Sequence, residues 1–559
     1  MTGIKIFRPA FNRTAANGMD HMALSHLDDR DHDLLFGEDA LEPGDAVVHF
    51  EHGLARYDGR MDCDLGDVDQ TLTTFMYRDG GKLMLPAREG EDFWRFGAPA
   101  DSLTLDRLKA GDWLKRRDEM IMELRESADR MIEIDEARRS THAVPLKPNA
   151  KAYGAVEAAF AHNPTTDQDR AIRAVLQDIG QTTPMDRLLV GDVGFGKTEV
   201  AVRAAAAAAL SGHQVIVAAP TTVLARQHFN TFRARLEDHG IKVAELSRLT
   251  TAEDRAATLD GLQSGAIAAV IGTQALLDDA ITFAALALVI IDEEQKFGEE
   301  QKTQLRHLAP GVHVLSMTAT PIPRSLAAAE VGLVDVSVVA TAPKNRKPVE
   351  TRLCARDVDA VLQAVETETA RDGQSYIVCP RVAGVTELDA ILKTRKVGFT
   401  YTIAHAQMPD EEMAAAMLSF MDGDVDVLLS TSIIESGLDN GRANTMAVWN
   451  ADRFGLSQLH QLRGRIGRSQ LPAHMLLMTG IDLDTPGEAA DRLTAFTEMS
   501  EIGAGFRIAR KDRDIRGFGT LDGTEQSGQM SRLGIGLYRH ILKNHLGMAS
   551  HGTPARKAS

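Results

Sequence analysis

Two blocks of the chain, residues 149–345 and 346–480, alternate short apolar runs with amphipathic stretches long enough to form helices. The run at 286–291 (Leu-Ala-Leu-Val-Ile-Ile) is apolar at every position, as is typical of a parallel strand covered on both faces. Further strands of this kind are predicted at residues 187–190, 376–378, 425–429 and 445–449. The pattern therefore predicts an α/β fold with two parallel-sheet lobes.

Two other patterns precede these blocks. Residues 41–100 contain short apolar runs separated by turn sequences such as Asp79-Gly80, a hairpin signal that predicts a small β-barrel. Within residues 101–148, apolar side chains recur near helical spacing and predict one long linker helix, which the prolines at 145 and 148 end. The apolar face of this helix is expected to carry Leu114, Ile121, Leu124, Ala128, Met131 and Ile132.

The remaining segments are polar or rich in glycine. Residues 1–40 are expected to be a poorly packed polar tail, and residues 546–559 a C-terminal tail. Residues 481–545 are expected to be helical with a glycine-rich stretch. His49 and His52 lie on one predicted strand and lack further ligand candidates nearby, which favours a structural role over metal binding.

Composition narrows the class of protein. The chain has 559 residues, with 62 Lys and Arg against 79 Asp and Glu, a net charge of −17. This balance excludes a uniformly basic protein, so any nucleic-acid path must be a local groove. Three isolated cysteines, at 63, 354 and 379, offer no paired spacing for zinc or disulfides and fit a reducing compartment. The chain start is no signal peptide and no run of about 18 apolar residues occurs, so we expect a cytoplasmic protein.

A phosphate-binding loop is predicted between the strand at 187–190 and an Ala-rich helix at 198–210. Its sequence fits the pattern Gly-x4-Gly-Lys-Thr, in which glycines let backbone N–H groups approach the phosphates of a nucleotide. Lys197 is expected to reach the β- and γ-phosphates, and Thr198 a Mg²⁺ ion. The predicted nucleotide-binding residues are Gly191, Asp192, Val193, Gly194, Phe195, Gly196, Lys197 and Thr198.

Two acidic residues follow the strand at 286–291, at an edge where nucleotides bind parallel sheets. Asp292 is expected to hold Mg²⁺, and Glu293 to orient or deprotonate the attacking water. In the second block, the pattern Gln-x-x-Gly-Arg-x-x-Arg places Arg465 and Arg468 close together. Arginine side chains suit the charge that spreads over a γ-phosphate during phosphoryl transfer. We therefore predict an ATP site between the two lobes, with these five groups, Lys197 included, as its catalytic set.

Beyond these motifs, the chain resembles the motor half of the bacterial transcription-repair coupling factors (the Mfd family) and, more distantly, the RecG fork-remodelling helicases. Both families belong to superfamily 2. The resemblance spans residues 41–545 and implies two RecA-like, ATP-binding lobes. The matching segments are residues 185–199, 220–225, 272–276, 317–324, 432–439, 452–469 and 503–506. It also implies that Gln168 reads adenine, and that Thr222, Thr273 and Thr431 lie along the DNA backbone.

Two further matches separate these families from generic helicases. Residues 516–528 look like the translocation motif shared by Mfd and RecG, in which the residues matching Arg516 and Gln526 couple ATP hydrolysis to movement along duplex DNA. Residues 44–57 look like the CarD-type barrel with which Mfd grips RNA polymerase, whereas RecG carries a DNA-wedge domain instead. The implied partners are double-stranded DNA and, through residues 41–100, the β subunit of RNA polymerase.

The chain departs from the Mfd pattern in several places. No part of this sequence matches two modules of Mfd: the UvrB-like module, which recruits UvrA, and the C-terminal domain, which restrains the motor. We therefore expect no UvrA recruitment and a high basal ATPase activity. Gln295 stands where the family usually has histidine, and Asn440-Gly441 where it tends to have Ile-Pro.

We expect an ATP-dependent DNA translocase that acts on RNA polymerase, associated with a bacterial nucleoid. One alternative is a RecG-like remodeller of branched DNA. A second is a CarD-like transcription regulator with an inactive motor.

Overall fold

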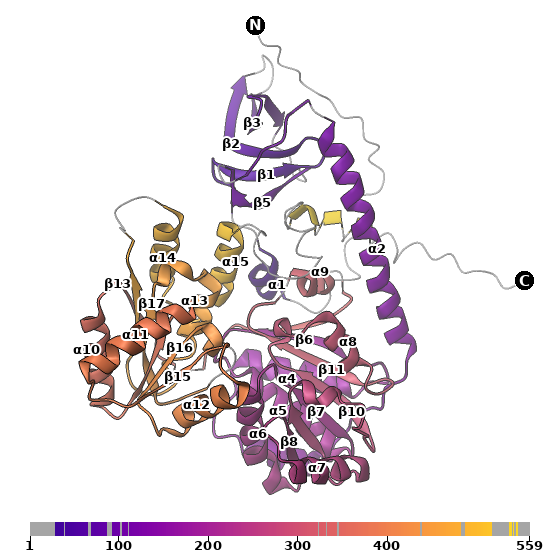
Figure 1. Ribbon diagram of the computed structural model, residues 1–559. Helices are drawn as coiled ribbons and strands as arrows, with labels where there is room; N and C mark the ends of the chain where they lie inside the picture. Colours follow the sequence, from indigo (N-terminus) through magenta and orange to yellow (C-terminus); the bar gives the residue numbers. More distant parts are fainter. Residues whose placement is uncertain are drawn as a thin grey trace, which may run out of the picture. The chain divides into compact units, whose positions relative to one another are not determined.

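The computed structural model describes residues 28–37, 40–64, 69–86, 92–100, 103–109, 111–321, 323–330, 332–343, 346–435, 439–481, 487–516, 536–538, 540–541 and 544–545. These residues form two compact units (Figure 1). The first comprises the described residues up to Glu136, those of Pro323–Val334 and those from Arg510 onward. The second comprises the described residues of Ala137–Ile322 and Asp335–Ala509 and holds both predicted lobes.

The first unit contains a five-stranded antiparallel sheet in the order β4-β3-β2-β1-β5. Its strands are β1 (Asp45–His49), β2 (Gly53–Asp64), β3 (Asp69–Met76), β4 (Lys82–Pro86) and β5 (Phe93–Pro99). Alternate residues of β1 enter different cores: Val47 packs with Tyr57 and Phe75, whereas Ala46 and Val48 face a core that includes α2. We predicted a small barrel here; among the described residues, β4 and β5 are the two edges of the sheet.

Helix α2 (Asp112–Ser140) covers part of the predicted linker segment. The buried side chains on its core-facing stripe recur at helical spacing: Trp113, Met120, Leu124, Ala128 and Met131. The expectation that Leu114 lies on this face is wrong, because 42% of Leu114 is exposed and the neighbouring Trp113 fills the core. The indole N–H of Trp113 also donates a 2.9 Å hydrogen bond to the Phe50 carbonyl, which fixes its orientation.

Within the predicted polar tail of residues 1–40, the described residues include a helix. Residues Asp29–Phe36 form helix α1, whose first turn is capped by the Asp28 carboxylate at 2.8 Å from the Asp31 amide. Leu35 and Phe36 are buried, so a short apolar end anchors an otherwise polar segment. The first unit also contains α9 (Pro323–Glu330).

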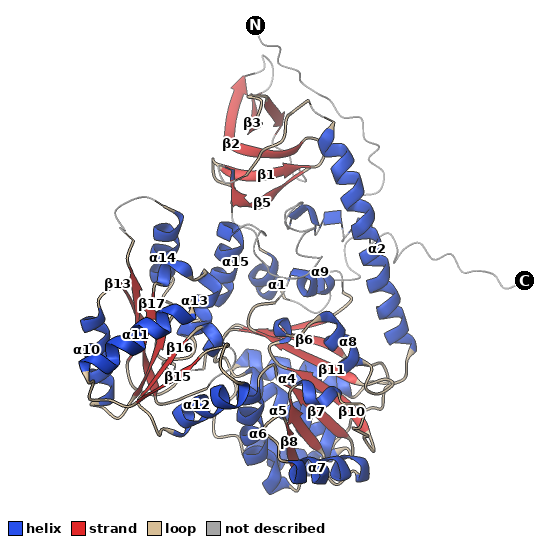
Figure 2. Ribbon diagram, in the orientation of Figure 1, coloured by secondary structure: helices blue, strands red, loops and turns tan. Residues whose placement is uncertain are grey.

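The first lobe of the second unit is a seven-stranded parallel sheet in the order β12-β6-β11-β10-β7-β9-β8 (Figure 2). Its strands are β6 (Asp186–Gly191), β7 (Gln214–Ala218), β8 (Val243–Leu246), β9 (Ala269–Gly272), β10 (Leu286–Ile291), β11 (His313–Thr318) and β12 (Asp335–Val339). Its helices are α3 (Ala150–Ala158), α4 (Thr166–Ile179), α5 (Lys197–Leu210), α6 (Thr222–Leu236), α7 (Ala252–Ser264) and α8 (Glu299–Arg306). Short 3₁₀ turns are η2 (Glu237–His239), η3 (Gln274–Leu277) and η4 (Glu294–Lys296).

The continuous apolar run predicted at 286–291 is strand β10, and both of its faces are covered. Leu288 and Ile290 pack with side chains of α4, α5 and α6, whereas Val289 and Ile291 pack on the other face with residues of α7 and α8. A strand buried on both faces has no polar face to alternate, which explains the pattern.

The second lobe is a six-stranded parallel sheet in the order β13-β18-β17-β14-β16-β15 (Figure 1). Its strands are β13 (Val349–Ala355), β14 (Gln374–Val378), β15 (Tyr401–Ala404), β16 (Val427–Ser430), β17 (Ala443–Trp449) and β18 (Ala473–Thr479). Its helices are α10 (Val358–Thr369), α11 (Val382–Arg395), α12 (Asp410–Asp422), α13 (Leu456–Arg463) and α14 (Glu488–Glu498), with η5 (Ser432–Glu435) and η6 (Ala451–Arg453). Helix α15 (Gly505–Arg516) follows.

The prediction of an α/β fold with two parallel-sheet lobes is confirmed, and the segment predicted as a small β-barrel forms a five-stranded antiparallel sheet. Within the described ranges, no helix combines the length and the apolar character that crossing a bilayer requires.

Candidate functional site: a cleft between the two lobes

The predicted phosphate loop joins β6 to α5 within the first lobe. Gly194 and Gly196 have φ of 76° and 78°, in the left-handed region that favours glycine. A Cβ at Gly196 would lie 2.2 Å from Nε2 of Gln168, so the close approach of that side chain also requires glycine here. These constraints leave a loop whose backbone amides precede a helix N-terminus, the arrangement that binds phosphate groups.

Lys197 is the first residue of α5, and its ammonium group lies against the loop. Its Nζ donates hydrogen bonds of 2.7 Å to the Gly191 carbonyl and 3.3 Å to the Asp192 carbonyl. Burial lowers the pKa of Lys197, although the carboxylates of Glu293 and Asp292 oppose that shift. The position of Lys197 matches a cation that would turn from these carbonyls toward phosphate oxygens.

Gln168 is buried beside the loop rather than free in a base-binding pocket. Its Nε2 donates a 2.7 Å hydrogen bond to the Phe195 carbonyl. Its Oε1 accepts one of 2.8 Å from the Thr165 amide, as the second half of a capping box at the start of α4. In this structure both ends of the amide have protein partners, so adenine reading by Gln168 stays a prediction.

Asp292, directly after β10, is held by two donors. His228 Nε2 lies 2.7 Å from its Oδ2, and the Glu293 amide donates a 2.9 Å hydrogen bond to its Oδ1. Burial alone would raise the pKa of Asp292, but the contact with His228 and the charge of Lys197 outweigh burial and lower it. The carboxylate is therefore kept ionised at the edge of the sheet.

Glu293 has φ of 50° and ψ of 51°, a left-handed conformation that is uncommon for a side chain of this size. Its Oε2 accepts a 2.6 Å hydrogen bond from Gln295 Nε2, and the Thr318 hydroxyl donates a 2.7 Å bond to Gln295 Oε1. This chain of bonds continues through Thr318 Oγ1, which accepts from the Thr320 amide at 3.1 Å. Thus Gln295 ties the acidic residue to the end of β11.

The second lobe reaches this cluster through the predicted arginine motif. Gln461 Nε2 lies 3.3 Å from the Thr320 hydroxyl, and Arg465 Nη2 lies 3.7 Å from Glu293 Oε1. Arg465 is 3% exposed and also donates to the Glu435 carbonyl. Lys197, Glu293 and Arg465, predicted from sequence segments far apart, are therefore brought to one cleft.

Arg468 lies next to Arg465 but has a different partner. Its Nη1 lies 2.7 Å from Oδ1 of Asp439, and the charge of Arg468 lowers the pKa of that carboxyl. The Asp439 amide donates a 2.7 Å hydrogen bond to Gln227 Oε1 of the first lobe. The structure thus places Arg468 at the lobe junction, paired with a carboxylate.

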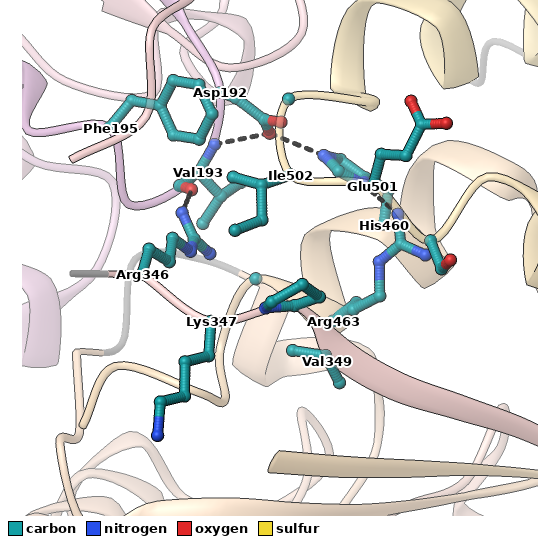
Figure 3. A pocket seen from close by; sticks show the side chains of 14 residues that line it. Asp192, Val193, Phe195, Arg346, Lys347, Val349, His460, Arg463, Glu501 and Ile502 are labelled. Atoms are coloured by element: carbon teal, nitrogen blue, oxygen red, sulfur yellow. Dashed lines mark hydrogen bonds and ion pairs between the residues drawn. The ribbon is translucent and has the colours of Figure 1, made fainter. Parts of the chain in front are cut away.

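A further contact between the lobes involves the side chain of Asp192. His460 Nε2 of α13 lies 2.5 Å from Asp192 Oδ1, and Arg463 Nη2 lies 3.2 Å from His460 Nδ1 (Figure 3). Arg346 donates to the carbonyl of Val193 from the segment between the two lobes. These groups line one pocket with Phe195, Lys347, Pro348, Val349, Gly464 and residues 500–503.

Three models of protein families match the chain. The DEAD/DEAH box helicase model matches residues 165–329, and the helicase conserved C-terminal domain model matches residues 356–470. The CarD-like/TRCF RID domain model matches residues 41–95. Transcription-repair-coupling factors of Bacillus subtilis and Staphylococcus haemolyticus are 38% and 37% identical to this chain over 508 and 504 residues.

Over most of its length, the chain is therefore similar to the transcription-repair-coupling factors. Each alignment covers 90% of this chain and 43% of the relative, so the chain spans less than half the length of those proteins. A solved structure of RecG bound to a three-way DNA junction is also similar, with a TM-score of 0.64 and 29% identity. That similarity covers 86% of this chain and 71% of RecG. The matches to the two helicase domain models imply the use of ATP.

The three threonines predicted to follow the DNA all come directly or shortly after parallel strands. Thr222 opens α6 after β7, and Thr273 follows β9, the neighbour of β7 in the sheet. Thr431 follows β16 in the second lobe. Contact of these residues with DNA remains a prediction. Arg516 ends α15, its side chain lies outside the described part of the structure, and Gln526 lies outside the described residues altogether.

Several residues of the cleft belong to none of the motifs found in the sequence, among them His228, Arg346 and His460. For His228 a signal was present: it lies four residues from both Leu224 and Phe232, on the buried face of α6. For the other two no local pattern exists, because their partners lie far away in the sequence.

Thr198 and Asp292 would hold Mg²⁺ through a hydroxyl and a carboxylate, oxygen ligands that suit this ion. No cluster of three or more His, Cys, Asp or Glu side chains that could hold a metal occurs in the described ranges. Among the described residues, His49 and His52 belong to no group of three or more possible metal ligands. Burial lowers the pKa of His49 to about 3.

Proposed function

We propose that this protein is an ATP-driven translocase of double-stranded DNA that acts on RNA polymerase. The observation that carries the proposal is the approach of Arg465 to Glu293 across the cleft, with Lys197 and Asp292 beside them. An ATP site completed by both lobes closes when nucleotide binds and opens after hydrolysis. Alternate closing and opening of two DNA-bound lobes converts the chemical step into movement.

Each residue of the cleft has a distinct role in this proposal. The loop amides and Lys197 bind the phosphates, and Lys197 neutralises charge on the β- and γ-phosphates. Glu293 orients the attacking water and accepts its proton, and Gln295 holds the other carboxylate oxygen in place. Arg465 stabilises the charge that develops on the transferred phosphoryl group. Mg²⁺, held by Thr198 and Asp292, would supply further neutralisation of phosphate charge.

The residues proposed to track DNA are Thr222, Thr273 and Thr431. Hydroxyl groups and backbone amides at strand ends are common ligands for phosphate oxygens and carry no sequence information. A net charge of −17 also disfavours binding over a broad surface, which supports a path confined to the cleft between the lobes.

RNA polymerase is the proposed target because residues 41–95 match the CarD-like/TRCF RID domain. The antiparallel sheet of this segment has two edge strands among the described residues, β4 and β5, and an edge can pair with a strand of another protein. We propose the β subunit as the contact on the polymerase.

A second candidate is remodelling of branched DNA. It is favoured by the similarity to RecG, whose solved structure holds a three-way DNA junction. Residues 41–95 match the CarD-like/TRCF RID domain, whereas RecG carries a DNA-wedge domain in front of its motor. This difference argues against a RecG-like function.

The deciding experiment is displacement of a stalled elongation complex by the purified protein. We expect ATP-dependent release of RNA polymerase, and loss of release when residues 41–100 are deleted. Unwinding of a three-way junction without any release of polymerase would favour the second candidate. Lack of DNA-stimulated ATPase activity would refute both.

A further inference from the structure

One carboxylate of the phosphate loop is shared by three segments of the second unit. The Asp192 side chain is 5% exposed and accepts from its neighbour Val193 at 2.7 Å, from His460 at 2.5 Å and from the Gly505 amide at 3.2 Å. His460 belongs to α13, and Gly505 is the first residue of α15. This side chain therefore joins the nucleotide cradle to the start of a helix 313 residues further along the chain.

The contact with Gly505 caps helix α15. The first N–H groups of a helix have no partner within it, and a negative charge at that end is stabilising. Here the acceptor comes from the phosphate loop. A Cβ at Gly505 would lie 2.6 Å from Cγ and both carboxylate oxygens of Asp192, so only glycine permits this approach.

His460 fixes the orientation of the Asp192 carboxylate. Its Nδ1 faces a guanidinium nitrogen of Arg463, which can only donate, so Nδ1 carries no proton. With Nδ1 as the acceptor, Nε2 is the ring nitrogen that donates to Asp192 (Figure 3). Arg463 is itself held 4.4 Å above the ring of Phe496 on α14. The imidazole is thus locked in one tautomer and one orientation.

The main chain of Asp192 is also part of the cradle, because its carbonyl accepts from Lys197 at 3.3 Å. Phosphates that draw Lys197 away would release this carbonyl and allow the peptide at Asp192 to move. Such movement changes the cap of α15 and the bond to His460 at the same time. Asp192 would then respond to the bound nucleotide through its carbonyl group. Through its carboxylate, the same residue holds the start of α15, the helix that ends at Arg516.

We propose that His460 and Gly505 are positioning residues that, through Asp192, pass the state of the nucleotide cradle to helix α15 and so couple ATP hydrolysis to movement. This inference rests on the proposed translocase function. It assigns coupling to a contact between the phosphate loop and α15, distinct from the arginines that face the reacting phosphate.

The test compares His460→Leu, His460→Gln and Gly505→Ala with the wild type. Glutamine can donate to Asp192 and accept from Arg463 as the neutral imidazole does, whereas leucine can do neither. Allosteric couplings are worth about 5- to 150-fold. We therefore expect His460→Leu and Gly505→Ala to lower triplex strands displaced per ATP hydrolysed by about tenfold, with DNA-stimulated ATPase within about threefold of wild type. His460→Gln should restore displacement.

Two matched controls should behave as wild type. His474→Leu removes a half-exposed histidine paired with Glu350, and Gly487→Ala adds a methyl group that meets nothing within 4 Å. A second readout needs no movement: hydrogen exchange of the amides of residues 505–509 with and without a non-hydrolysable ATP analogue. Exchange should respond to the analogue in the wild type and in His460→Gln, and should not respond in His460→Leu.

Wild-type coupling in His460→Leu and Gly505→Ala would overturn the inference. It would also be overturned if His460→Leu lost ATPase and displacement in equal proportion without rescue by glutamine, since that pattern marks a structural role only. If the wild type itself hydrolysed ATP without displacing a strand, the proposed function would fail instead. Thermal unfolding of each variant identifies any that do not fold, and the exchange experiment on His460→Gln and Gly505→Ala then decides.

Discussion

Gln295 Nε2 lies 2.6 Å from Oε2 of Glu293, while the other end of the same amide accepts from Thr318. A glutamine can donate and accept at once at any pH, whereas a histidine in this position can do both only while it is neutral. Glutamine in place of the histidine of the Asp-Glu-Glu-His pattern therefore keeps both hydrogen bonds, to Glu293 and Thr318. It also removes a side chain that could change its protonation state with pH.

Replacing Gln295 by histidine should introduce a pH dependence. Near pH 8 the neutral ring supplies one donor and one acceptor, so ATPase activity should stay close to wild type. Below about pH 6.5, the ordinary pKa of histidine, protonation removes the acceptor for Thr318 and activity should fall more steeply than in the wild type. A pH series of kcat measures this, with Gln177→His on the exposed side of α4 as the control. Identical profiles for Gln295→His and wild type would contradict the role given to this amide.

Lys197→Ala should abolish turnover. The Lys197 ammonium lies against the phosphate loop, and without it the phosphates would lose a positive partner. We expect kcat of the DNA-stimulated ATPase to fall by at least about 100-fold, since charge stabilisation of this kind contributes several kcal/mol to catalysis. Lys393→Ala, an exposed lysine of α11, is the matched control. Retention of wild-type kcat in Lys197→Ala would show that hydrolysis occurs elsewhere.

Arg465→Lys should be nearly as damaging as Arg465→Ala. Lysine keeps the charge but not the planar, forked set of donors that can bind two phosphate oxygens at once. In the structure, Arg465 Nη2 alone contacts both the Glu435 carbonyl and the Glu293 carboxylate. Loss of an arginine finger lowers kcat by about 10³-fold or more, and we expect an effect of that order with KM for ATP little changed. Arg395→Lys, half-exposed on α11, provides the control. Full activity of Arg465→Lys would mean that charge alone is needed.

Arg516→Ala and Gln526→Ala should separate hydrolysis from movement. Both positions lie outside the two nucleotide-binding motifs, so the chemistry of ATP hydrolysis should continue while DNA movement stops. Triplex displacement and ATPase measured side by side give the answer. Normal displacement by either variant would remove the residue from the translocation motif.

Asn440→Ala should destabilise the second lobe. Asn440 Nδ2 donates a 3.0 Å hydrogen bond to Gln374 Oε1, and its own Oδ1 accepts from the Arg442 amide at 2.9 Å. Both side chains are buried, so truncation leaves polar groups without partners and should cost about 1–3 kcal/mol of unfolding free energy. Denaturant unfolding measures the change, and the exposed Asn163→Ala serves as control. An unchanged midpoint would show that water replaces the amide.

The order of residues within short segments was enough to predict several elements of the fold and part of the candidate site. The conformation of a short loop depends on the residues within it and on the elements beside it. The glycines and Lys197, between an apolar run and an Ala-rich stretch, therefore predicted β6, the phosphate loop and α5. The unbroken apolar run at 286–291 likewise predicted a strand covered on both faces, and Asp292 and Glu293 at its end. The sequence also showed that Asn440 departs from the Ile-Pro pattern of Mfd. It did not show that Asn440 donates a hydrogen bond to Gln374, 66 residues away.

Only the tertiary structure decided which distant groups meet. His228 contacts Asp292 across 64 residues and His460 contacts Asp192 across 268, because packing of helices on sheets fixes these distances and no periodicity encodes them. The choice of Trp113 over Leu114 on α2 has the same origin, since both fit a helical stripe and only the shape of the facing core selects one. Arg468, for which the sequence predicted a role beside the phosphate, pairs with Asp439 of the same lobe, because the fold of that lobe brings the two segments together.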